Sequence, residues 1–208
     1  MLNVLVLVSG GGTNLQALID QIKSGAVKNA FIAAVVSSNH RAYALQRAVD
    51  NNIPCEVISR KSFDTFDAFD DAMLLICRKY DIHLVVLAGY LSMLGKKFVK
   101  AYENKIINIH PSLIPSFCGK GYYGITPHEK ALEYGVKITG ATAHFIDYEY
   151  DSGPIILQKA VQVEQDDTPV SLQKRVMEEG EQKILPLAVD LFCQGKIKVE
   201  GRKVTILP

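Results

Sequence analysis

Cysteine is scarce in this sequence and is never arranged as a ligand set. The 208 residues include four cysteines, Cys55, Cys77, Cys118 and Cys193, which lie far apart and form no Cys-x-x-Cys pair. This spacing predicts neither a zinc site nor a disulfide framework. The five histidines likewise show no His-x-x-x-His spacing, so the sequence predicts no metal.

A membrane-length apolar run and a charge excess are also absent. The apolar stretch at residues 84–94 has about half of the roughly 20 residues that span a bilayer. Residues 2–8 lack a basic flank and a cleavage site and lead directly into a glycine turn, as a buried strand does and a signal peptide does not. A net charge of +1 gives no reason to expect a nucleic-acid partner. We therefore expect a cytoplasmic protein with no membrane segment.

The apolar pattern predicts an α/β fold. The length and the 48% hydrophobic composition are typical of one globular domain, residues 1–208. Up to about residue 110, continuous apolar runs alternate with helix-period segments, as in strands that crossover helices bury on both faces. This Rossmann-like half, 1–110, is expected to have strands at 2–8, 30–37, 54–58, 83–88 and 105–110, and helices at 14–24, 41–51, 64–79 and 96–103.

The second half, residues 111–208, has a different pattern. We expect a long loop rich in Gly, Tyr and Pro, a helix near 127–134, β-rich segments at 138–146 and 154–163, a helix at 169–194 and a hairpin at 197–206. Pro186 predicts a kink or a division of that last helix. The whole is a doubly wound, mostly parallel sheet with a mixed C-terminal extension and a C-terminal helix, whose ligands lie beyond the carboxyl ends of the strands.

Residues 9–14, Ser-Gly-Gly-Gly-Thr-Asn, follow the first predicted strand and open the first predicted helix. Backbone N–H groups and the helix dipole favour an anion at such a turn. It is not a dinucleotide fingerprint, because Leu15 replaces the third glycine and the second strand ends in Ser-Ser-Asn, without an acid for a ribose. The turn predicts a site for one phosphate, with a purely structural tight turn as the alternative.

Asn108 and His110 are the strongest chemical signal. Residues two apart on a strand point to the same face, and Pro111 ends the strand, so both side chains are expected at its carboxyl end. Asp151, in a later turn, can return to His110 and hold it protonated. The three residues indicate acyl-transfer chemistry; the alternative is a strand-end Asn and His that the backbone satisfies. A Cys118 nucleophile is disfavoured, because no basic partner is assured.

These motifs resemble the phosphoribosylglycinamide formyltransferase family of folate-dependent enzymes in purine synthesis. The resemblance covers essentially the whole chain, through Ser-Gly-x-Gly-Thr-Asn-Leu-Gln at 9–16, Val-Val-Leu-Ala-Gly-Tyr at 85–90, Asn-Ile-His-Pro-Ser-Leu at 108–113, and His-Phe at 144–145 followed by Asp-Ser-Gly-Pro at 151–154. The second and third motifs are shared by formyltetrahydrofolate hydrolases and transferases. The first motif, and the lack of room for a further domain, favour the transferase of purine synthesis.

The resemblance implies formyl transfer from 10-formyltetrahydrofolate, a cosubstrate, to the amine of glycinamide ribonucleotide, with no metal and no nucleic acid, in a monomer or homodimer. Asn108 and protonated His110 would stabilise the tetrahedral intermediate, and Asp151 would raise the pKa of His110. The phosphate and ribose would be held by Gly12, Thr13, Asn14 and Glu181. Folate would be held by Asn108 and Asp151 together with Leu91, Ser92, Met93, Leu94, Asp147, Tyr148, Glu149 and Tyr150.

The sequence departs from the family pattern at the folate tail. Ser92 and Phe66 stand where members of the family carry arginines, so tail binding falls to Lys61 or another cation. Two other functions remain open: a 10-formyltetrahydrofolate hydrolase, which uses the same trio with water as the nucleophile, and a noncatalytic sensor of a phosphate ligand, which needs only the glycine turn.

Overall fold

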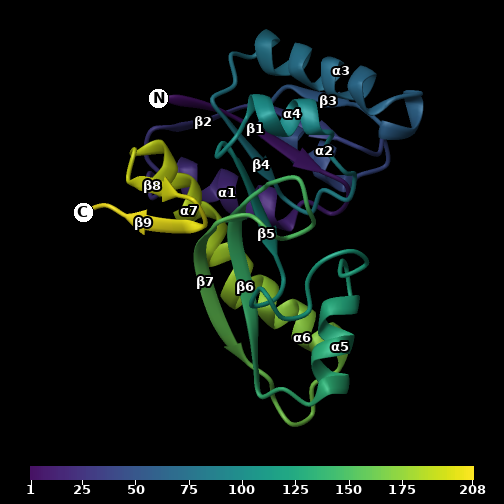
Figure 1. The fold of residues 1–208 in the computed structure, drawn as a ribbon, viewed down its shortest axis with the longest axis vertical. Coiled ribbons are helices and arrows are strands. Elements are labelled where there is room, and N and C mark those ends of the chain that lie inside the picture. The colour runs from purple at the N-terminus through teal and green to yellow at the C-terminus, as the bar shows by residue number, and fades with distance from the viewer.

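A seven-stranded sheet dominates the computed structural model, which describes residues 1–208 (Figure 1). Its strands lie in the order β3-β2-β1-β4-β5-β6-β7. The first five are parallel, whereas β6 and β7 are antiparallel to their neighbours. The strands are β1 (Leu2–Val8), β2 (Ala30–Ser37), β3 (Cys55–Val57), β4 (Leu84–Leu87), β5 (Ile106–His110), β6 (Ile138–Phe145) and β7 (Ile155–Gln162).

Helices cover both faces of the sheet. They are α1 (Thr13–Lys23), α2 (Tyr43–Asp50), α3 (Phe66–Lys79), α4 (Lys96–Ala101), α5 (Thr126–Tyr134), α6 (Pro169–Arg175) and α7 (Gln182–Cys193), with a short 3-10 turn η1 (Arg60–Ser62). A separate hairpin, β8 (Ile197–Glu200) and β9 (Lys203–Ile206), ends the chain. None of the helices combines the length and the apolar character that a membrane crossing requires.

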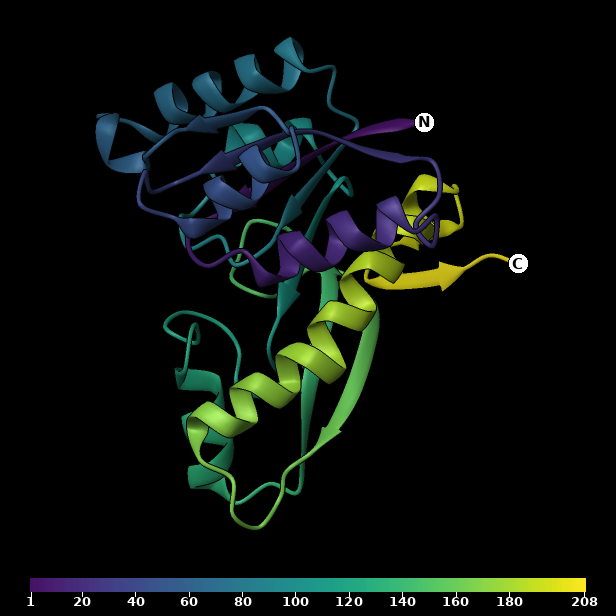
Figure 2. The ribbon, with the colours of Figure 1, turned by 180° about the vertical axis from the view of Figure 1, so that it is seen from behind.

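The central strand shows why the two faces are both buried. In β1, Val4, Val6 and Val8 pack into one apolar cluster, with α1, α2 and α7, while Leu5 and Leu7 pack into a second, with α3 and α4. In Figure 2, α1 and α7 lie side by side in front of the sheet. A strand buried on both faces reads as a continuous apolar run, so the predicted α/β class with a mixed C-terminal extension is confirmed.

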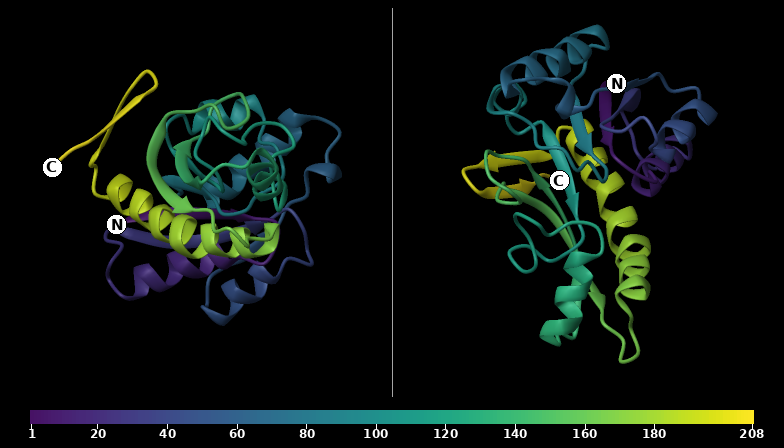
Figure 3. Two further views of the ribbon diagram at one scale, coloured as in Figure 1. Left: turned by 90° about the horizontal axis from the view of Figure 1, so that it is seen from below. Right: turned by 90° about the vertical axis from the view of Figure 1, so that its right-hand side faces the viewer.

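The long C-terminal helix is interrupted at a different place from the one that the sequence predicts. Helix α6, a π-helical turn η2 (Val176–Glu181) and α7 follow one another as one long helix (Figure 3), and Pro186 lies inside α7. The prediction of a division at Pro186 was therefore wrong. The wider turn brings Gly180 against β6, where an added Cβ would lie 3.0 Å from the Cβ of Ala141, and it turns Glu181 towards α1.

The change from parallel to antiparallel pairing at β6 determines which side chains lie beside Asn108 and His110 at the end of β5. In the register between β5 and β6, Asn108 lies opposite His144 and His110 lies opposite Thr142. Because directly opposite residues have neighbouring side chains, the end of β5 carries its Asn and His beside the second half of the chain.

Candidate active site

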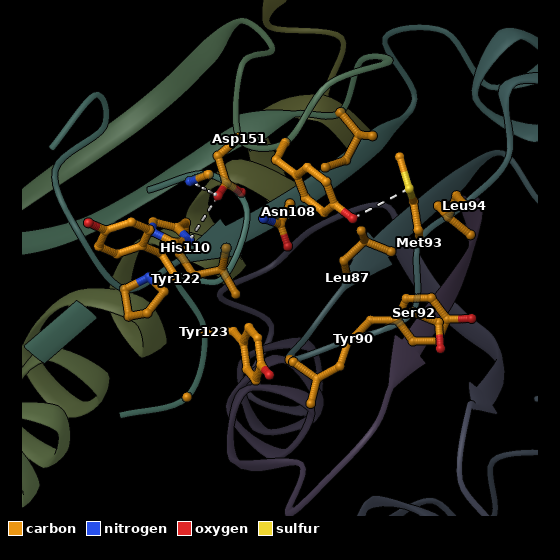
Figure 4. Close-up of a pocket in the computed structure, with 18 of the residues that line it drawn as sticks. Leu87, Tyr90, Ser92, Met93, Leu94, Asn108, His110, Tyr122, Tyr123 and Asp151 are labelled. Carbon is orange, nitrogen blue, oxygen red and sulfur yellow. Dashed lines mark hydrogen bonds and ion pairs between the residues drawn. The ribbon is translucent and has the colours of Figure 1, made fainter. Parts of the chain in front are cut away.

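One cavity of about 710 Å³ lies at the carboxyl ends of β4 and β5 and takes in most of the predicted site (Figure 4). Its walls come from the glycine turn, the segment after β4, the end of β5, the long loop before α5, the loop between β6 and β7, and η2. It is lined by these predicted residues: Thr13, Asn14, Leu91, Ser92, Met93, Leu94, Asn108, His110, Asp147, Tyr148, Glu149, Tyr150, Asp151 and Glu181.

Of the predicted residues, Gly12 and Lys61, the cation suggested for the folate tail, do not line the cavity. Gly12 caps α1 with a φ of 73°, and an added Cβ would lie 2.6 Å from the Cβ of Ala44 in α2. Only glycine fits both the left-handed backbone and this close approach. Its role in the structure is to shape the turn, while Gly10, Thr13 and Asn14 face the cavity.

Asn108 is oriented by a chain of hydrogen bonds that ends on the backbone. The Nδ1 of His144 donates to the carbonyl oxygen of Phe145 over 2.9 Å, which leaves Nε2 of the neutral ring as an acceptor. Nδ2 of Asn108 donates to that Nε2 over 3.0 Å. Burial lowers the pKa of His144 and so favours this neutral ring. The amide of Asn108 therefore keeps one of its two N–H donors free.

His110 and Asp151 form the second part of the polar site. Nε2 of His110 donates to the carbonyl oxygen of Phe117 over 3.0 Å, which directs Nδ1 towards Asp151, 3.6 Å from its Oδ2 (Figure 4). The carboxylate is itself fixed, because the Gly119 amide donates to Oδ2 over 2.8 Å. Since 3.6 Å is longer than a hydrogen bond, Nδ1 is free to meet a ligand.

Glu181 joins the glycine turn to the C-terminal helix. Its Oε2 accepts a hydrogen bond of 2.6 Å from Nδ2 of Asn14. Burial raises the pKa of Glu181, and the bond from Asn14 opposes that shift. Oδ1 of Asn14 is buried without a partner, so this end of the cavity holds both an acidic group and an unused acceptor.

The other end of the cavity is apolar and open. Leu91 and Met93 follow β4, and Tyr148 and Tyr150 project from the loop between β6 and β7; all four are exposed. Across the opening, the hydroxyl of Tyr150 donates to the sulfur of Met93 over 3.5 Å (Figure 4). A flat ligand between these two segments would bury apolar surface on both of its faces.

Four contributors were not predicted from sequence. His144 orients Asn108, the Phe117 carbonyl orients His110, and the Gly119 amide holds Asp151. His128, in α5, lines the cavity with both ring nitrogens buried and unpartnered. Only His144 had a sequence signal, since it stands in the motif that ends at Pro154. The backbone groups depend on how the long loop folds.

An α/β sheet with Asn and His at the end of one strand and a carboxylate in a later loop fits the class of formyl transferases. A match to the formyl transferase family covers residues 2–189. The chain therefore belongs to that family, as the resemblance of its motifs predicted. Phosphoribosylglycinamide formyltransferase of Haemophilus influenzae is 38% identical to it over 200 residues, which are 96% of this chain and 91% of the relative.

A solved structure and a longer relative extend this comparison. Glycinamide ribonucleotide transformylase 1 from Symbiobacterium toebii superposes with a TM-score of 0.93 at 39% identity, covering 100% of this chain and 95% of that chain. The trifunctional purine biosynthetic protein adenosine-3 of Homo sapiens is 41% identical over 196 residues. The chain spans 19% of the length of that protein.

Proposed function

We propose that this protein transfers the formyl group of 10-formyltetrahydrofolate to the amine of glycinamide ribonucleotide, a step of purine synthesis, in the cytoplasm and as a monomer or homodimer. The observation that carries the proposal is the position of Asn108, His110 and Asp151 between two different ends of one cavity. One end offers an anion site and the other offers apolar walls. The names of the relatives of similar length support the same substrates.

The ribonucleotide occupies the end formed by the glycine turn. Its phosphate meets the backbone N–H groups at the start of α1, where the helix dipole favours an anion. Its ribose hydroxyls reach Glu181, which accepts from them, and Oδ1 of Asn14, which has no other partner. This arrangement leaves the amine of the glycinamide directed towards the end of β5.

Folate occupies the open end, with its pterin between the segment 91–94 and the loop 147–151. Both segments line the cavity. Binding the two substrates at opposite ends of one cavity holds the amine and the formyl carbon together over Asn108 and His110, which replaces a bimolecular encounter by an oriented one.

The polar residues then stabilise the charge that the attack creates. When the amine bonds to the formyl carbon, the formyl oxygen becomes negative. The free N–H of Asn108 and Nδ1–H of His110 donate to this oxygen. Asp151, 3.6 Å from Nδ1, stabilises the positive imidazole. When this intermediate collapses, the bond between the formyl carbon and the folate nitrogen breaks and the carbonyl re-forms. The amine loses a proton and the departing folate nitrogen gains one; His110 and Asp151 are the groups within reach that exchange protons.

The proposal is tested with purified protein and 10-formyltetrahydrofolate, with and without glycinamide ribonucleotide. Tetrahydrofolate is followed by absorbance, and formate is measured in parallel. We expect turnover only with the ribonucleotide and no formate. Formate released without the ribonucleotide would show that the protein is a hydrolase and not a transferase. No turnover under either condition, together with binding of the ribonucleotide, would leave a sensor of a phosphate ligand.

A further inference from the structure

Ser9 joins the two segments to which the proposed function assigns the two substrates. It follows β1 and begins the glycine turn, and its hydroxyl oxygen accepts a hydrogen bond of 2.9 Å from the backbone N–H of Leu91, in the segment after β4. Because β1 and β4 are parallel neighbours in the sheet, their carboxyl ends bring these two residues together. Ser9 does not line the cavity, so it acts on a bound ligand through the residues that it holds.

The segment of residues 89–94 has few other hydrogen bonds to fix it. Its backbone makes no hydrogen bond to another backbone group, and the bond from Leu91 to Ser9 is the one hydrogen bond that this backbone makes. The side chains of Tyr90 and Leu94 are buried, whereas that of Leu91 is exposed. The position of Leu91 in the cavity wall therefore depends on where Ser9 lies.

The glycine turn is bonded to α2 through its carbonyl groups. The carbonyl oxygen of Gly10 accepts from the backbone N–H of Ala44 over 3.0 Å, and that of Gly11 accepts from Nε of Arg47 over 2.8 Å. The N–H groups of both glycines make no hydrogen bond to another backbone group. Because glycine has wide conformational freedom, an anion that binds these N–H groups restricts the turn and, with it, the adjoining Ser9.

A second serine beside Ser9 offers a comparison. The hydroxyl oxygen of Ser38, the residue after β2, lies 2.6 Å from that of Ser9. A hydroxyl has one donor and two acceptor lone pairs, so Ser9 bonds to Ser38 and Leu91 at once. Ser38 also lies outside the cavity. Removing the hydroxyl of Ser38 takes one bond from Ser9 and leaves the bond to Leu91.

We propose that Ser9 is a positioning residue that couples the two substrate sites. A ribonucleotide whose phosphate orders the glycine turn also fixes Leu91 through the hydroxyl of Ser9, and so orders the wall against which folate binds. This inference rests on the proposed function. Once one ligand has ordered both segments, the second loses less conformational entropy when it binds. The coupling is reciprocal, so folate strengthens ribonucleotide binding by the same factor.

The first test measures the affinity for tetrahydrofolate by calorimetry, with and without saturating glycinamide ribonucleotide. Tetrahydrofolate carries no formyl group, so no transfer occurs during the measurement. Because one hydrogen bond carries the coupling, we expect the ribonucleotide to tighten binding about fivefold in the unaltered protein. Ser9→Ala should lose this gain and keep its affinity for the ribonucleotide alone. Its KM for 10-formyltetrahydrofolate should rise about as much, with kcat unchanged.

Ser38→Ala is the matched control, because it removes a neighbouring hydroxyl of the same size and leaves the bond between Ser9 and Leu91. It should keep the gain in affinity. The coupling would be overturned by a gain that persists in Ser9→Ala or by no gain in the unaltered protein. Equal loss of the gain in the two variants would also overturn it, since the bond to Leu91 would then not be its carrier.

Amide hydrogen exchange gives a second measurement that needs no variant. Adding the ribonucleotide alone to the unaltered protein should slow exchange of the Leu91 amide, because local opening of its bond to Ser9 becomes rarer. Unchanged exchange at Leu91 would overturn the coupling. Turnover that requires the ribonucleotide, without any coupling, refutes this inference and leaves the proposed function standing. Slower exchange at Leu91 without turnover refutes the proposed function and leaves the coupling standing.

Discussion

The part of the cavity around the end of β5, called the polar end from here on, and the open apolar end are built in opposite ways. At the polar end, His110 and His144 are 4% and 0% exposed and each ring is held by hydrogen bonds. At the open end, Leu91 is 63% exposed and Tyr148 is 50% exposed. Asn108, His110 and His144 stand on strands, whose register fixes them before any ligand arrives. The apolar side chains stand on loops and gain their partners from the ligand.

Under the proposed function, this contrast separates the residues that act in the chemical step from those that bind the folate. Groups that stabilise a developing charge are effective when they are already oriented and need no rearrangement during the reaction. Groups that bind a large apolar ring contribute by being removed from water when the ligand enters. Changes at the polar end should therefore act on kcat, and changes at the open end should act on KM.

The largest effect is expected for Asn108→Ala. This change removes the free N–H donor at the end of β5, and loss of one such donor lowers kcat by about a hundred- to a thousandfold in comparable sites. The KM for each substrate should change little. Both values are checked by steady-state kinetics in which one substrate is varied while the other is kept saturating, and then the reverse.

The matched control is Asn3→Ala, which also removes a side-chain amide that makes one hydrogen bond, since Nδ2 of Asn3 donates to the carbonyl of Tyr80. It lies outside the cavity and should lower stability without lowering kcat. If Asn108→Ala kept kcat within a few-fold of the unaltered protein, the polar end would not be the place of charge stabilisation.

A second prediction concerns the burial of the polar end. Burial lowers the pKa of His128 to about 4, and the neighbouring His110 adds to the shift. Between pH 6.5 and 4 the unfolded chain therefore binds a proton that the folded protein refuses, so stability falls as the pH drops through this window. At about 1.4 kcal/mol per pKa unit, His128 accounts for about 2 to 3 kcal/mol of that loss.

Replacing His128 by leucine, which has a similar volume, should reduce the loss of stability between pH 6.5 and 4. It also removes two buried unpartnered nitrogens, so stability at pH 7 should stay equal or rise. Denaturant unfolding at pH 7, 6, 5 and 4 measures both effects. A residual slope is expected, because burial also lowers the pKa of His144. An unchanged slope in the leucine variant would show that His128 takes up its proton in the folded state.

The sequence predicted the side chains to which the proposed function gives the chemistry and missed the groups that orient them, for a physical reason. Alternation along β5 alone places Asn108 and His110 on one side, and the change of pattern after it places Asp151 in a turn. The partners of these residues depend on strand register and loop conformation. His144 faces Asn108 only because β6 pairs antiparallel to β5, and the carbonyl of Phe117 reaches His110 only through the course of the long loop.

The C-terminal helix also contains a feature that depends on distant contacts and that the local sequence did not predict. Pro186 is a local signal for a break, whereas the actual irregularity is the π-helical turn at Val176–Glu181. That turn serves a distant contact, the approach of Gly180 to Ala141 in β6. Local propensity cannot report a contact between residues so far apart in the chain.

The smallest predicted effect is at the open end, where Leu91→Ala removes part of an exposed apolar wall. If the pterin covers this side chain, the loss of about three carbons, which bury only part of their surface, weakens folate binding by about 1 kcal/mol, or roughly fivefold in KM, while kcat stays the same. Leu75→Ala is the matched control, because Leu75 is 60% exposed on α3 and lies outside the cavity; it should change neither value. Equal KM values for the two variants would mean that the ligand does not lie against Leu91. A fall in kcat for Leu91→Ala would mean that the open end also positions the reacting carbon, so that binding and chemistry are not separated between the two ends.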